Sequence, residues 1–355
     1  MVVEEACRTK PHEIDVSYMH LTCCPSRIGF IGVQLASLNM SNNRLPDIPE
    51  EIGCLRGLQE LFLQYNCLTS LPKGIGRLEQ LYELDLKNNM LRSLPDAIGD
   101  LRALAVLNVT NNALESLPAS IGRLTALREV SAHSNCLERL PVEICELSNV
   151  TTLYLGENPL RALPERISAL RRLQELDVSD CALTRLPDAL AQCGSLIRLW
   201  LSNNRLRELP AQIGRLQQLK ELHVRNNALR YFPASLRMLR LYTFTAVNNP
   251  LVEEGESDAI AALQRRPASR VPPLLESCCR GVVAHGVAWE AAGLPRDLHN
   301  MLRAPRQCCN CGGPFFTYCQ SSLVFDSIGM FFRVPIYQNI CSPFRKNKCR
   351  PMVFQ

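Results

Sequence analysis

The stretch from Leu58 to Leu68, LQELFLQYNCL, decides the fold of this 355-residue chain. It returns as LYELDLKNNML from Leu81 and as LAVLNVTNNAL from Leu104, so the repeat period is 23 residues. Aliphatic residues stand at the same four places in each copy, and an asparagine follows the third of them. A fixed period of this length predicts a solenoid, in which each repeat packs only against its neighbours.

Ten successive copies of this stretch cover residues 35–252. Together with LPxxIGxL segments after the strands, they resemble the leucine-rich repeats of the intracellular, Ras-group-like class. The resemblance implies an α/β horseshoe with short parallel strands on its concave face. The sequence IDVSYMHLTCCP from Ile14 reads as a degenerate first turn. We therefore predict a cap at 1–34, a solenoid at 35–252, a linker with two helices at 253–306 and a cysteine-rich tail at 307–355.

The asparagines of the repeats have a predicted structural role. Their side chains can bond to backbone groups of the turn that leaves each strand, which satisfies buried polar backbone. Cys181 takes one of these places and is expected to be tolerated there. The asparagines concerned are Asn43, Asn66, Asn89, Asn112, Asn135, Asn158, Asn204 and Asn227.

The residue between the two strand leucines should point into the concavity, because side chains alternate along a strand. Aromatic residues at and beside these places are candidate contacts for a protein partner, since exposed Trp and Tyr dominate interfaces. The alternative is that they are single exposed aromatics without a role. The candidate partner-binding residues are Phe62, Tyr65, Tyr154, Arg198, Trp200 and His223.

Catalysis is not expected on this face. Asp85, Glu175 and Asp177 resemble an acid set, but an open sheet offers no enclosed site that would shift their pKa values. The sequence also lacks a nucleophile–base pair or a phosphate-binding loop. We therefore predict a protein that is not an enzyme.

Two short helices are expected beyond the array, at about 273–285 and from Pro295 to before Pro305. The segment PLLESCCRGV, 273–282, is similar to the BC-box of proteins that recruit Elongin B/C, and it matches at each defined position. The segment LPRDLHNML, 294–302, is similar to a cullin box of the cullin-2 type. Asp297 stands where the cullin-5 form has a second proline. The resemblance implies contacts through Leu274, Cys278, Val282, Leu294, Pro295 and Leu298.

The repeats and the two boxes together resemble the leucine-rich repeat substrate receptors of Elongin BC–cullin ubiquitin ligases. That resemblance implies a target protein on the concave face, Elongin B/C, and cullin-2 or cullin-5 as partners. The alternative is a repeat scaffold of Ras-type signalling, in which the C-terminal helices only cap the last repeat.

The C-terminal tail contains a candidate zinc site. Cys308 and Cys311 form a C-x-x-C knuckle, and Cys341 and Cys349 could supply the other half. The last pair departs from the expected C-x-x-x-C spacing, so Cys309 and Cys319 are alternative ligands. The remaining interpretation is a set of small buried thiols in a β-rich extension.

Charge and cysteine placement bound the environment. A formal net charge of +5, spread over many acids and bases, gives no case for nucleic acid. No secretory signal and no apolar run of about 18 residues is visible, so no membrane partner is expected. Single cysteines inside repeats indicate reduced thiols that fill small apolar sites. We expect a cytoplasmic protein, with the nucleus as a further location.

Overall fold

The protein is described by a computed structural model, which covers residues 11–252 in full. Beyond these it describes the backbone of 306–307, 314–315, 319–328 and 331–341. The chain divides into two compact units. The first holds residues up to 207 with 216–228 and 240–248, and the second holds 208–215, 229–239 and the chain from 249 onward.

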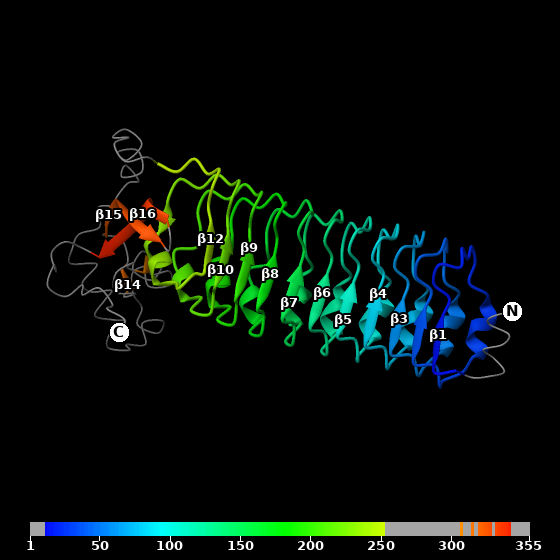
Figure 1. Cartoon of the computed structure of the whole chain (residues 1–355). Coiled ribbons are helices and arrows are strands. Elements are labelled where there is room, and N and C mark those ends of the chain that lie inside the picture. The colour runs from blue at the N-terminus through cyan, green and yellow to red at the C-terminus, as the bar shows by residue number, and fades with distance from the viewer. Residues whose placement is uncertain (1–10, 253–305, 308–313, 316–318, 329–330, 342–355) are drawn as a thin grey trace, which may run out of the picture. The chain divides into compact units, whose positions relative to one another are not determined.

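The first unit is built on an 11-stranded sheet in which consecutive strands pair in parallel (Figure 1). Neighbours are in register at one repeat period, as in Glu60↔Glu83 and Leu61↔Leu84. The degenerate first turn forms strand β1 and pairs with β2, as expected. The strands are β1 Glu13–Asp15, β2 Ser37–Asn39, β3 Glu60–Phe62, β4 Glu83–Asp85, β5 Val106–Asn108, β6 Glu129–Ser131, β7 Thr152–Tyr154, β8 Glu175–Asp177, β9 Arg198–Trp200, β10 Glu221–His223 and β12 Thr243–Thr245.

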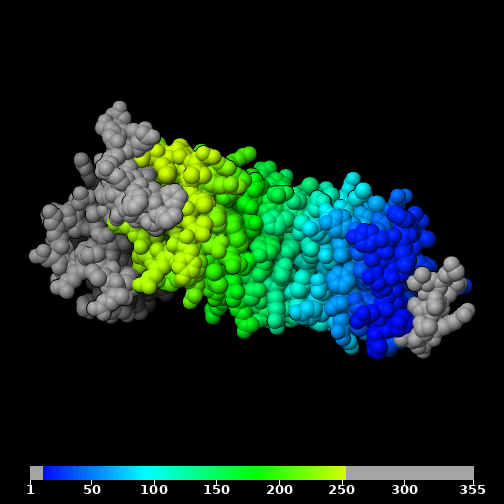
Figure 2. Space-filling model, viewed as in Figure 1, coloured from blue at the N-terminus to red at the C-terminus, as the bar shows by residue number. Residues whose placement is uncertain are grey.

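The core lies behind this sheet. Leu61 and Leu63 are fully buried, whereas Phe62 between them is half-buried on the opposite face. The isoleucine of the outer segment, Ile75, closes the core from the other side. Each buried leucine or isoleucine side chain contributes about 1.5–3 kcal/mol, so stability is distributed along the array. Figure 2 shows successive repeats following one another in order.

The asparagines act as predicted. The Asn66 amide donates to the carbonyl oxygens of Met40 at 2.9 Å and Leu63 at 3.0 Å, and its oxygen accepts from the Leu45 N–H at 3.0 Å. All eight asparagines named above donate to backbone carbonyl groups in this way. The Cys181 thiol substitutes for one of them and lies 3.4 Å from the Ser179 carbonyl oxygen.

The outer segments are 3-10 helices, and no α-helix occurs among the residues that the structure describes. Eight of the described 3-10 helices follow a proline in an extended conformation, as Lys73–Arg77 follows Pro72. Tight spacing between repeats limits these turns, since a Cβ on Gly53 would lie 2.4 Å from the Gly74 carbonyl oxygen. The helices of the first unit are η1 Ser26–Phe30, η2 Glu50–Cys54, η3 Lys73–Arg77, η4 Asp96–Asp100, η5 Ala119–Arg123, η6 Val142–Glu146, η7 Ile167–Ala169 and η8 Asp188–Gln192.

The second unit contains η9 Ile213–Arg215, η10 Ala234–Met238 and five strands. Strand β11, Phe232–Pro233, pairs in parallel with β16, Phe331–Cys341, which pairs antiparallel with β15, Cys319–Ile328. Strands β13, Arg306–Gln307, and β14, Pro314–Phe315, form a separate antiparallel pair. The β15–β16 register sets Cys319 opposite Cys341.

The cysteines of the array follow the expectation with two exceptions. Every cysteine between residues 11 and 252 is a free thiol, and Cys145 and Cys193 are buried. Burial raises the pKa of Cys193 to about 11, which keeps this thiol protonated and unreactive at neutral pH. Cys54 and Cys136 are exposed, so neither fills an apolar site. The Cys136 side chain leaves the core because it follows the inward-facing Asn135.

Candidate functional site

The candidate site is the open face of the sheet, formed by side chains that alternate with the buried leucines. We call it the strand face and define it by three outward positions in and just after each of β3–β10. These positions hold seven carboxylates and three Lys or Arg side chains. The carboxylates are Glu60, Glu83, Asp85, Glu129, Glu175, Asp177 and Glu221, and the cations are Lys87, Arg198 and Arg225.

Aromatic rings and imidazoles form a continuous row on the strand face from β6 to β10. The His133 and Tyr154 ring centroids lie 5.7 Å apart, and Tyr154 meets Trp200 edge-on at 6.3 Å. Trp200 stacks on His223 at 6.2 Å with an interplanar angle of 9°. Such pairs hold one another in place, so the row is a pre-organised, half-buried apolar surface. We call it the aromatic row.

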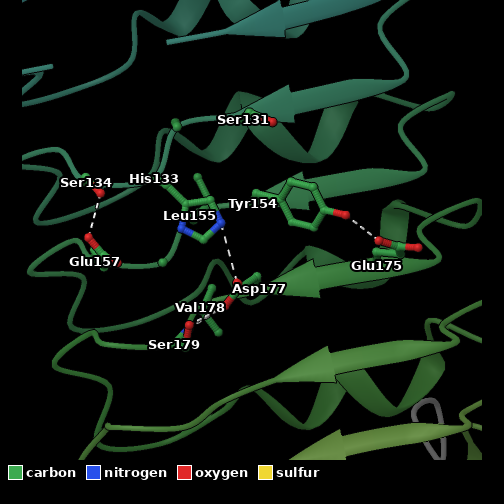
Figure 3. A network of polar contacts seen from close by, with 12 residues as sticks. Ser131, His133, Ser134, Tyr154, Leu155, Glu157, Glu175, Asp177, Val178 and Ser179 are labelled. Carbon is green, nitrogen blue, oxygen red and sulfur yellow. Dashed lines mark hydrogen bonds and ion pairs between the residues drawn. The ribbon is translucent and has the colours of Figure 1, made fainter. Parts of the chain in front are cut away.

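Charged side chains flank the aromatic row and pair across strands. Arg198 donates to Glu175, and its Nε lies 3.3 Å from Glu221 Oε1. The Tyr154 hydroxyl also donates to Glu175 (Figure 3). Burial first, and then the bond and charge of Glu175, raise the pKa of Tyr154 to about 12. The hydroxyl is therefore neutral at physiological pH and acts as a hydrogen-bond donor.

A His–Asp pair on this face invites comparison with a catalytic triad. His133 Nε2 lies 3.4 Å from Asp177 Oδ2, and the Ser179 hydroxyl donates to Asp177 Oδ1 at 2.6 Å (Figure 3). In a triad the imidazole lies between hydroxyl and carboxylate, so that it can remove the hydroxyl proton. Here the carboxylate lies between them. The contacts join side chains from two repeats that lie two periods apart, and the geometry does not activate Ser179.

The sequence-predicted residues are only partly brought together. Tyr154, Trp200, His223 and Arg198 form the cluster described above. Phe62 lies on the same face on β3, four strands from Tyr154, which is about 19 Å at the usual strand spacing. Tyr65 lies beyond the end of β3 in a turn with φ 57° and is 49% exposed. It occupies the left-handed position that asparagine takes in most other repeats.

The expectation of unshifted acids was wrong for Asp85. Burial is the largest cause that raises its pKa, although the Lys87 amide and charge oppose the shift. Burial also raises the pKa of Glu83, and the charges of Glu60, Asp85 and Glu129 add to the effect. The face is open, but side chains on the two neighbouring strands cover part of each carboxylate. The carboxylate therefore loses contact with water.

Sequence reasoning did not identify the His133–Asp177 contact or the exposed Ser134–Glu157 hydrogen bond of 2.6 Å (Figure 3). Glu157 follows Ser134 by one period of 23 residues, so the repeat register carried the signal. His133 and Asp177 are 44 residues apart, close to two periods. Pairs near multiples of the period are therefore the ones to search for contacts in such arrays.

The C-terminal predictions lie mostly outside the described residues. This holds for the BC-box-like residues Leu274, Cys278 and Val282 and for the cullin-box-like residues Leu294, Pro295 and Leu298. It also holds for the proposed zinc ligands Cys308, Cys311 and Cys349, whereas Cys341 ends strand β16. No helix in the described part of the chain has both the length and the apolar character needed to span a membrane.

Comparison with known proteins agrees with the geometry. The family described as "Leucine rich repeat" matches residues 33–91, 56–114, 79–137 and 171–229. Plant intracellular Ras-group-related LRR protein 7 of Oryza sativa subsp. japonica is 36% identical over 58 residues. Those residues are 16% of this chain and 22% of the rice protein.

Solved structures show the same repeat architecture. The leucine-rich repeat ectodomain of the Arabidopsis receptor kinase HAESA, in complex with an IDA peptide hormone ligand, is 28% identical with a TM-score of 0.58. The match covers 66% of this chain and 42% of that one. A TDR receptor structure is 25% identical with a TM-score of 0.55, over 69% and 49% of the two chains. The chain thus spans less than half the length of these structures.

The fold, the periodic core and the open strand face define the class of this protein. It has the fold of a leucine-rich repeat solenoid.

Proposed function

We propose that the chain is a substrate receptor of an Elongin BC–cullin ubiquitin ligase, with a target protein bound on the strand face. The aromatic row carries this proposal on the target side. Tyr154 and Trp200 are fixed by ring contacts and flanked by charged pairs, a combination typical of interface hot spots. The HAESA structure, with a peptide hormone bound to a repeat ectodomain, supports the use of such an array for protein ligands.

The ligase side rests on sequence. The segments 273–282 and 294–302 match the BC-box and cullin-box patterns in the correct order after the array. Leu274, Cys278 and Val282 recur at four-residue spacing, which places them on one face of a helix. Tethering a target next to the ubiquitin-charged enzyme raises the effective concentration of its lysines, so the chain itself needs no catalytic group.

A pull-down tests the ligase side. The full chain should capture Elongin B/C and a cullin, and the Leu274→Ser/Cys278→Phe variant should lose both. The matched control is Glu276→Ser/Arg280→Ser, which changes the same predicted helix only at undefined positions of the pattern and should retain both. Absence of Elongin B/C and cullin from the wild-type capture would refute the receptor role.

The alternative is a repeat scaffold of Ras-type signalling with a purely structural C-terminal cap. The name of the 36% identical rice protein favours it, over 58 residues. In that case both C-terminal variants should behave like the wild type, and a small GTPase or its regulator should be captured through the strand face.

We further propose that the C-terminal tail binds zinc. Cys308 and Cys311 would supply one half of the site. The cross-strand register of Cys319 and Cys341 favours Cys319 over Cys349 as a partner of Cys341. Metal analysis of the purified full chain should find about one zinc per chain. A Cys311→Ser variant should lose it, whereas Cys54→Ser in the array should not.

A further inference from the structure

The strand face is charged differently from the rest of the protein. Its outward positions hold seven carboxylates and three Lys or Arg side chains, although the whole chain has a formal net charge of +5. The face is therefore an acidic strip on a mildly basic protein. Nucleic acid and anionic membrane surfaces are repelled from it, because both carry negative charge.

The acids at one end of the strip stand beside one another. Glu60 and Glu83 are direct register partners on β3 and β4, and Glu129 lies two strands further along. Neighbouring strands are about 4.8 Å apart, so Glu60 and Glu83 repel each other at short range, and Glu129 acts on Glu83 from about 10 Å. Burial first, and then the charges of Glu60, Asp85 and Glu129, raise the pKa of Glu83. A bound cation would remove this repulsion.

The two ends of the strip differ in how their acids are neutralised. Within residues 11–252, the ion pairs of the strand face involve Asp177, Glu175 and Glu221, next to the aromatic row. None of the ion pairs found there involves Glu60 or Glu83. The β3–β6 end therefore offers Glu60, Glu83 and Glu129 outside these ion pairs, with Lys87 as a cation beside Asp85, and the β7–β10 end offers rings.

We propose that the partner of the strand face presents an extended segment rich in lysine and arginine. Its cationic side chains lie over Glu60, Glu83 and Glu129. An arginine or an apolar side chain packs on Tyr154 and Trp200, where ring faces attract cations. This inference rests on the strand face being the target-binding surface, as proposed above, and adds the chemistry of the target.

The length of the segment follows from the register. Six strand spacings separate β3 from β9, which is about 29 Å. An extended chain covers this distance in about nine residues at roughly 3.3 Å each. Basic residues should thus precede or follow the aromatic-binding residue by several positions, in one continuous stretch.

Fluorescence anisotropy with a labelled peptide tests the proposal on the full chain. The probe is an arginine–serine peptide of about ten residues with one central tyrosine, compared with a glutamate–serine peptide of the same length. The face variant is Glu60→Gln/Glu83→Gln/Glu129→Gln. The matched control removes the same charge from exposed positions outside the strand face, in Glu79→Gln/Glu115→Gln/Glu146→Gln.

The wild type should bind the arginine peptide and not the glutamate peptide. The face variant should weaken binding by about tenfold or more, because three screened charge contacts are lost. The control variant should change it by less than about twofold, although its net charge is the same. Circular dichroism melting checks that both variants are folded.

Equal loss in the face and control variants would show unspecific charge attraction and overturn the proposal. Preference for the glutamate peptide, or no binding of either peptide, would also overturn it. The assay contains no Elongin or cullin, so its failure is separate from failure of the ligase pull-down.

Discussion

Asn158 gives the sharpest test of how the array is held together. Its side chain is 2% exposed and bonds to backbone groups of two successive repeats. The amide donates to the carbonyl oxygens of Ala132 and Leu155, each at 2.9 Å, and the side-chain oxygen accepts from the Leu137 N–H at 3.0 Å. An Asn158→Ala substitution removes the side-chain partners of all three groups.

The expected cost follows from these contacts. A buried polar group that loses its partner costs about 1–3 kcal/mol. In the Asn158→Ala variant, the Leu137 N–H and the Ala132 carbonyl both lose their side-chain partner. The substitution should therefore lower the free energy of unfolding by about 4 kcal/mol. Asn158→Cys should cost less, since the Cys181 thiol fills the same place in the next repeat.

Urea denaturation followed by circular dichroism measures this loss, and amide hydrogen exchange at Leu137 localises it. The matched control is Asn203→Gly, at a half-buried asparagine with φ 57° whose side-chain amide donates to Asp180 Oδ1 at 2.7 Å. Glycine accepts this backbone conformation, so the control should cost less than about 1 kcal/mol. Equal destabilisation by both variants would refute the role assigned to the buried asparagines.

Three further predictions concern packing and charge. Gly57→Ala should lower the free energy of unfolding by about 1–3 kcal/mol, measured by urea denaturation, because the new Cβ would lie 1.7 Å from a backbone oxygen of the preceding repeat. Gly194→Ala is the control, because its Cβ would meet open space, and it should leave the free energy of unfolding unchanged. Glu83→Gln should stabilise the protein by less than about 1 kcal/mol at neutral pH. This gain should vanish as the pH falls through the raised pKa of Glu83 toward the unfolded value of about 4.3. A gain that persists at low pH would contradict burial and charge repulsion of the Glu83 carboxylate as its cause. Glu175→Gln should lower the pKa of Tyr154 from about 12. The pKa should stay above the ordinary value of about 10, because burial is the largest cause of the shift. Ultraviolet difference titration against the Tyr154→Phe variant measures the pKa of Tyr154.

The sequence predicted the repeat geometry closely because a strict period restricts each position. The spacing of Leu58, Leu61 and Leu63 is enough to set strand, face and core, and these leucines are fully buried. The bonding of the asparagines followed from the need to satisfy buried backbone. The outer segments became 3-10 helices because short, proline-led turns must stack closely, and the leucine pattern does not encode that spacing.

The site was less predictable because it depends on side chains of different repeats. The register Glu60↔Glu83 could have been derived from the 23-residue period, and with it the raised pKa of Glu83. The Tyr154–Glu175 bond crosses strands diagonally, and its existence depends on rotamers that no pattern fixes. A short amphipathic pattern such as 273–282 predicts which residues share one helix face. It does not predict whether that face packs on the same chain or binds a partner.

The measurement that tests the central claim most directly compares proteins captured by the wild type and by strand-face variants. Tyr154→Ala/Trp200→Ala should lose the target protein and retain Elongin B/C and cullin. The control variant Tyr82→Ala/Tyr242→Ala, which removes two exposed tyrosines outside the strand face, should retain all of them. Loss of the target by more than about tenfold in the first variant alone is the result we predict for an interface hot spot. A target captured equally well without Tyr154 and Trp200 would contradict the assignment of the strand face as the binding surface.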